Sequence, residues 1–207
     1  MEPSEPYDIS RIDFDRLRQE FADNPYPRTT VQTLKQAIAA RLQRLLEQNP
    51  QRTNFQQYYE ELIAEYNREK DRPTIEATFD ALLEFVQELD EESRRALREG
   101  LDEETLVIYD LLYKPDLTAA DMQRIKEVAV ELLAALKVEK LRIDHWRDKE
   151  ATRDAVRIAI HNFLWSDATG LPFPSYDEIE VAEKTTAVFQ HVYRAYPTVP
   201  SPYYVAA

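Results

Sequence analysis

The sequence contains no cysteine and only two glycines, Gly100 and Gly170, among its 207 residues. The missing cysteines exclude disulfides, thiolate zinc sites and a cysteine nucleophile. Two distant glycines cannot build a glycine-rich phosphate loop or a dinucleotide-binding fingerprint. Sheet-rich folds are also disfavoured, because their turns and bulges use glycine.

Long apolar runs are also missing. No run approaches the roughly 20 residues that a membrane span needs. The first residues, Met-Glu-Pro-Ser-Glu-Pro, lack the basic region and apolar run of a signal peptide. We therefore expect a cytoplasmic protein that does not enter a membrane.

Cations are too few to balance the acids: 26 Lys and Arg stand against 39 Asp and Glu, which gives a net charge of −13. Such a charge disfavours non-specific affinity for nucleic acid or anionic lipid, although a local basic face remains possible. We expect weak or no direct DNA binding.

Apolar residues recur at helical spacing along nearly the whole chain, which predicts an all-α protein, a multi-helix bundle of about eight helices. The expected helical ranges are 13–22, 30–48, 53–70, 73–89, 91–100, 102–112, 118–141, 147–164 and 175–195. Residues 197–207 hold three prolines and two tyrosines and are predicted to form an extended C-terminal tail.

The sequence also predicts where several helices begin and end. The predicted signals are an N-cap at Asp102, capping boxes at Thr118 with Asp121 and at Ser175 with Glu178, and a C-terminal cap at Gly100. The weakest seam lies at residues 70–73 or else near Gly100. We expect a segment 1–100 and a segment 101–207, which are also compatible with a single packed unit.

No catalytic constellation is recognisable. His145, His161 and His191 are far apart, and none belongs to a Glu-x-x-His or His-Glu-x-x-His metal motif. We therefore expect no catalytic residue, metal site or cofactor site in this chain, and structural or surface roles for the histidines.

One segment, residues 135–157, combines an aromatic residue with closely spaced cations. It predicts contact candidates for a partner or a phosphate, namely Trp146, Arg147, Lys149, Arg153 and Arg157. Two plainer interpretations stay open. The alternating charges are typical of an exposed face laced with ion pairs, and Trp146 could be a core residue wedged between two helices.

Several passages together resemble a known family, the R (motor) subunit of type I restriction endonucleases, in its C-terminal region. The matching passages are Tyr-Asp-Leu-Leu at 109–112, Ala-Val-Glu-Leu-Leu at 129–133, Asp-His-Trp-Arg-Asp-Lys-Glu at 144–150, and 184–193. Further passages, at 49–55, 64–67 and 99–101, resemble the helical segment just upstream. The resemblance covers about residues 12–196.

The resemblance implies that this chain is a C-terminal piece of a larger subunit that cleaves and translocates DNA with ATP and Mg²⁺. The nuclease acids and the nucleotide-binding loop of that subunit are not found here. The resemblance implies that this chain is a non-catalytic helical docking module whose partner is the methyltransferase (modification) subunit.

Two other functions fit the composition. A stand-alone acidic helical protein could mimic DNA or act as a protein-interaction scaffold, but the cations mixed among its acids count against mimicry. A small-molecule enzyme with a site inside a helical bundle would need a deep pocket lined by titratable groups with shifted pKa values.

Overall fold

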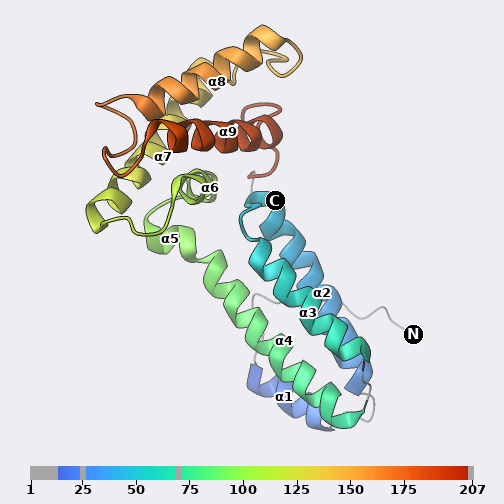
Figure 1. The fold of residues 1–207 in the computed structure, drawn as a ribbon. Helices are drawn as coiled ribbons and strands as arrows, with labels where there is room; N and C mark the ends of the chain where they lie inside the picture. Colours follow the sequence, from blue (N-terminus) through green and yellow to red (C-terminus); the bar gives the residue numbers. More distant parts are fainter. Residues whose placement is uncertain (1–13, 24–26, 69–70, 205–207) are drawn as a thin grey trace. The chain divides into compact units, whose positions relative to one another are not determined.

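The computed structural model describes residues 14–23, 27–68 and 71–204 (Figure 1). Within these ranges the chain forms nine helices and no strand. The prediction of an all-α bundle of about eight helices is therefore confirmed. None of the helices described is both long and apolar enough to cross a membrane. The predicted helix start at residue 13 and the predicted helix end at residue 70 lie outside the described residues.

The chain divides into two compact units, Met1–Arg95 and Ala96–Ala207. We call them the N-terminal unit and the C-terminal unit and describe each by itself. Each has its own cluster of buried apolar side chains.

The N-terminal unit contains α1 (Phe14–Asp23), α2 (Pro27–Gln48), α3 (Thr53–Arg68) and α4 (Arg72–Ser93). Helix α2 packs against α1, α3 and α4, and α3 also packs against α4. The apolar stripe predicted for α2 is confirmed, because all of its members are buried: Val31, Leu34, Ile38, Leu42 and Leu45. The rings of Phe21 and Phe79 stack with their centroids 3.8 Å apart.

Helix α4 begins as predicted and ends later than predicted. Asp71 caps its first turn by accepting a hydrogen bond from the Thr74 amide at 3.0 Å, and Pro73 lies in that turn. The helix continues to Ser93 instead of ending near Leu89.

The short helix α5 (Arg95–Glu99) ends at Gly100, as predicted. Gly100 has a φ of 70°, and the Leu101 amide donates to the Ala96 carbonyl at 2.9 Å. This is a Schellman cap, in which glycine adopts the left-handed conformation without steric cost.

The C-terminal unit is a ring of four helices after α5: α6 (Glu103–Leu112), α7 (Ala119–Glu139), α8 (Glu150–Trp165) and α9 (Glu178–Ala195). Helix α6 packs against α7, α7 against α8, α8 against α9, and α9 against α6. The four-helix ring surrounds the apolar cluster of this unit.

Of the three N-terminal helix caps predicted in this unit, two are confirmed and one is wrong. The capping by Asp102 and by Thr118 with Asp121 is present. Ser175 does not cap α9; the capping box is formed by Asp177 and Glu180. The Ser175 hydroxyl donates instead to the Asp121 carboxylate of α7 at 2.9 Å. A long-range hydrogen bond has replaced the local one.

Helix α8 begins at Glu150 and not near Arg147, because residues 141–149 form turns. His145 has a φ of 53° there, which a helix does not allow. The described part of the tail is non-helical, as expected, but it turns back on the unit. Ser201 is buried and donates to the Ala195 carbonyl at 2.6 Å.

Candidate functional site: a polar network and an apolar cap

Trp146 lies in the core of the C-terminal unit, with 1 % of its surface exposed. Its indole N–H donates to the Tyr196 carbonyl at 2.9 Å, and its ring meets the edge of Tyr193 at a centroid distance of 5.9 Å. The core interpretation is therefore confirmed, and the contact interpretation is wrong for this residue, because the buried ring has no surface to offer a partner.

The structure brings Arg147 and Arg153 together at the turn that contains Trp146. Arg153 donates to the Arg147 carbonyl at 2.7 Å, and Arg147 donates to the Tyr193 carbonyl of α9 at 3.1 Å. Arg153 thereby satisfies a carbonyl of the turn, and Arg147 ties the turn to α9. Both guanidinium groups have internal acceptors.

The other two predicted contact residues differ in their surroundings. Arg157 is exposed and lies over the ring of Phe189, with its guanidinium carbon 4.6 Å from the ring centroid. Lys149 is exposed at the N-cap position of α8 and makes no capping hydrogen bond through its side chain. These two cations are the fully exposed members of the predicted set, and Arg147 and Arg153 are half-buried.

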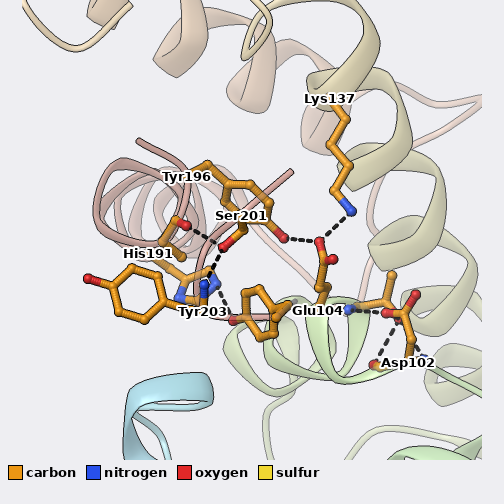
Figure 2. Close-up of polar contacts among 10 residues, drawn as sticks. Asp102, Glu104, Lys137, His191, Tyr196, Ser201 and Tyr203 are labelled. Carbon is orange, nitrogen blue, oxygen red and sulfur yellow. Dashed lines mark hydrogen bonds and ion pairs between the residues drawn. The ribbon is translucent and has the colours of Figure 1, made fainter. Parts of the chain in front are cut away.

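A polar network closes the end of the four-helix ring where α9 ends (Figure 2). The Glu104 carboxylate of α6 accepts a hydrogen bond from the Tyr196 hydroxyl at 2.5 Å and pairs with Lys137 of α7. Burial, and then the neighbouring Glu104, raise the pKa of Tyr196. The phenol therefore remains a hydrogen-bond donor at neutral pH, which fits a structural role.

His191 lies beside this network and is almost fully buried. Its Nε2 is 3.2 Å from the Tyr204 hydroxyl, and its Nδ1 has no hydrogen-bond partner among the described residues. Burial, and then the positive charge of Arg194, lower the pKa of His191 to about 4. The imidazole is therefore neutral near pH 7 and acts as a core residue.

No three side chains of His, Asp or Glu in the described ranges converge to hold a metal ion. Two pockets of about 290 and 560 Å³ lie in the N-terminal unit, along α1 with α4 and along α3 with α4. The groups with the largest pKa shifts, Tyr176, His191 and Tyr196, lie in the C-terminal unit and line neither pocket. The combination expected of a small-molecule enzyme is therefore not found in these pockets.

Cations are distributed among the acids as ion pairs. They join α2 to α4 through Arg41 and Asp90, and α7 to the segments before it through Lys126 with Glu99 and Lys137 with Glu104. An uninterrupted acidic array, which DNA mimicry requires, is broken at these positions.

A group of exposed apolar side chains that the sequence interpretation missed lies at the other end of the four-helix ring. We call Trp165, Phe173 and Ile179 the apolar cap; their exposed fractions are 51 %, 86 % and 71 %. They come from the end of α8, the loop after it and the start of α9. One signal was present in the sequence: Trp165 directly follows the buried stripe of Val156, Ile160 and Leu164 and falls outside its spacing.

Within the described ranges the chain is all-helical, with a polar network at one end of the four-helix ring and exposed apolar side chains at the other. The chain belongs to the family described as Type I restriction enzyme HindI endonuclease subunit-like, C-terminal, whose model matches residues 2–194. The resemblance derived from the sequence is thereby confirmed. No curated protein and no solved structure matches the chain significantly.

Proposed function

We propose that this chain is a non-catalytic helical module that docks the DNA-translocating endonuclease subunit of a type I restriction enzyme onto its methyltransferase core. One observation carries the proposal: the family match runs through both units and is specific to the C-terminal region of the endonuclease subunit. ATP and Mg²⁺ would then act in other parts of the parent subunit, in the cytoplasm.

The chemistry of the chain supports a binding role. The titratable groups with the largest pKa shifts are engaged in packing and hydrogen bonds, as Tyr176 is with the Leu112 carbonyl at 2.7 Å. Large apolar side chains nevertheless stay exposed on the C-terminal unit, Phe173 at 86 % among them. Exposed aromatic residues are typical anchors of protein interfaces.

Titration calorimetry of the chain with the cognate methyltransferase core tests the proposal. We expect saturable binding with a defined stoichiometry, and no binding to a methyltransferase core from an unrelated restriction system. The same preparation, incubated with plasmid DNA, ATP and Mg²⁺, should neither cleave DNA nor turn over ATP above a mock preparation. Absence of binding to the cognate core would refute the docking role.

A further inference from the structure

We propose that the apolar cap of Trp165, Phe173 and Ile179 is the surface that docks, and that it enters an apolar pocket ringed by Lys and Arg on the methyltransferase subunit. The inference rests on the proposed function and deepens it by naming the surface and the chemistry of its partner.

The three side chains share one end of the four-helix ring. Helix α8 ends and α9 begins on the same side of the C-terminal unit, and the loop between them joins these two helix ends (Figure 1). The loop returns directly to the end of α8, because the Leu171 amide donates to the Leu164 carbonyl at 2.9 Å. Gly170 permits this approach, since a Cβ atom there would overlap the Leu164 carbonyl.

The loop is held in place before any partner binds. Arg124 of α7 donates to the Gly170 carbonyl at 3.2 Å and to the Ala168 carbonyl at 2.8 Å. The Tyr176 hydroxyl, which is buried, donates to the Leu112 carbonyl at the end of α6. A pre-organised loop loses little conformational entropy on binding, so exposed anchors on it are effective.

The acidic side chains around the cap are more exposed than the basic ones. Asp167 and Glu178 are exposed and lie near it in the chain. The nearby cations are less exposed and already engaged: Lys114 pairs with Glu180, and Lys184 donates to the Tyr113 carbonyl at 2.9 Å. The cap therefore presents apolar anchors with an acidic rim.

An acidic rim selects among possible occupants. It repels phosphate groups, which disfavours DNA, and it would meet the same acids on a second copy of this chain, whose net charge is also −13. A basic protein surface with an apolar pocket complements both features of the cap.

The two tryptophans of the chain provide the test, because Trp165 is in the cap and Trp146 is buried. The chain is labelled with 5-fluorotryptophan and titrated with unlabelled methyltransferase core while ¹⁹F spectra are recorded. We expect the Trp165 resonance to shift on binding and the Trp146 resonance to stay, which makes Trp146 an internal control.

Variants measure the strength of the contact. Trp165→Ala and Phe173→Ala should each weaken the affinity for the core by about 30-fold, the level that marks an interface hot spot. Val138→Ala is the matched control, because Val138 is 63 % exposed near the far end of α7; it should leave the affinity unchanged. Asp167→Lys should weaken binding most at low salt, and Glu131→Lys, on the exposed part of α7, should not.

The outcomes separate the two proposals. If the wild-type chain binds the core but the Trp165 resonance and the affinities of the cap variants stay unchanged, the cap is not the docking surface and the docking role stands. If the wild-type chain does not bind, both proposals fail. Concentration-dependent dimerisation that Trp165→Ala abolishes, or binding of duplex DNA through the cap, would overturn the assignment of a basic protein partner.

Discussion

Trp146 joins the turn of residues 141–149 to the last turn of α9 through a single buried indole. We expect Trp146→Ala to lower the free energy of unfolding of the C-terminal unit by about 3–5 kcal/mol, because it removes a large core side chain and leaves the Tyr196 carbonyl without its donor. Chemical denaturation followed by circular dichroism measures the loss.

A second variant separates packing from hydrogen bonding at this position. Trp146→Phe keeps most of the apolar contact and removes only the N–H donor, so it should cost about 1–3 kcal/mol. A Trp146→Ala protein that is as stable as the wild type would contradict the core role of this residue.

His191 makes stability depend on pH. Its pKa is about 4 in the folded chain, below the ordinary value of 6.5, so the unfolded chain binds more protons between these two values. Stability should therefore be full above pH 6.5 and decrease as the pH falls toward 4, by roughly 3 kcal/mol for this group alone. Melting temperatures recorded from pH 7.5 to about 4 follow the decrease.

The control is His191→Gln, which keeps a polar side chain of similar size and cannot titrate. The melting temperature of this variant should be lower than that of the wild type near neutral pH. Between pH 6.5 and 4, however, it should decrease less than the melting temperature of the wild type does. An equal decrease in both proteins would assign the pH dependence to other groups.

At the scale of elements, the turn between α2 and α3 is fixed by a buried cation. Arg52 has 2 % of its side chain exposed and pairs with Glu92 of α4 at 2.8 Å, while Arg95 pairs with the same carboxylate at 2.9 Å. Asn49, also buried, accepts a hydrogen bond from the Gln51 amide at 3.0 Å. The passage 49–55, one of those that carried the resemblance, is thus where α2, α3 and α4 are tied together.

We expect Arg52→Ala to destabilise the N-terminal unit by about 3 kcal/mol, the low end for breaking a buried ion pair, because Glu92 keeps Arg95 as a partner. Hydrogen exchange should show faster exchange in α2 and α3 and unchanged exchange in α6 to α9. Arg72→Ala, which removes an exposed pair within α4, is the control and should cost no more than about 0.5 kcal/mol.

The helices were predictable because their signals are local. Apolar spacing predicted the buried stripe of α2, and residues three apart predicted the capping box of Thr118 with Asp121. The failures have long-range causes. Ser175 had the spacing of a cap, but Asp121, distant in sequence, takes its hydroxyl. The turn before α8 depends on His145 in a left-handed conformation, which periodicity does not reveal.

The candidate site was less predictable than the fold. Charge clustering around Trp146 indicated a contact surface, yet Arg147 and Arg153 donate to backbone carbonyls. Whether a guanidinium faces solvent or a carbonyl depends on how α8 packs against α9, which sequence spacing leaves open. Trp165 lies one position off the buried stripe, so its exposure could be derived from helical geometry. That it shares one end of the four-helix ring with the loop of Phe173 depends on the folded structure.

At the scale of the whole molecule, the charge limits what the chain can bind. Lys and Arg are outnumbered, and several of them are committed to ion pairs such as Lys114 with Glu180 and Lys126 with Glu99. The paired cations are less available to replace counterions on a phosphate backbone. This charge balance favours protein contacts over DNA contacts.

We therefore expect only weak binding to duplex DNA at about 0.15 M salt, with a Kd no tighter than roughly 10⁻⁶ M, the strong end of ordinary non-specific binding. Fluorescence anisotropy of a labelled duplex, titrated with the chain, measures it. Any residual binding should fall further in an Arg153→Ala, Arg157→Ala double variant, because these cations lie one helical turn apart on α8. It should fall much less in Lys126→Ala, whose ammonium group is already paired with Glu99. A Kd near 10⁻⁷ M or tighter at this salt concentration would contradict this expectation. It would mean that positive charge is concentrated on part of the surface despite the ion pairs described above. DNA would then replace protein as the favoured partner.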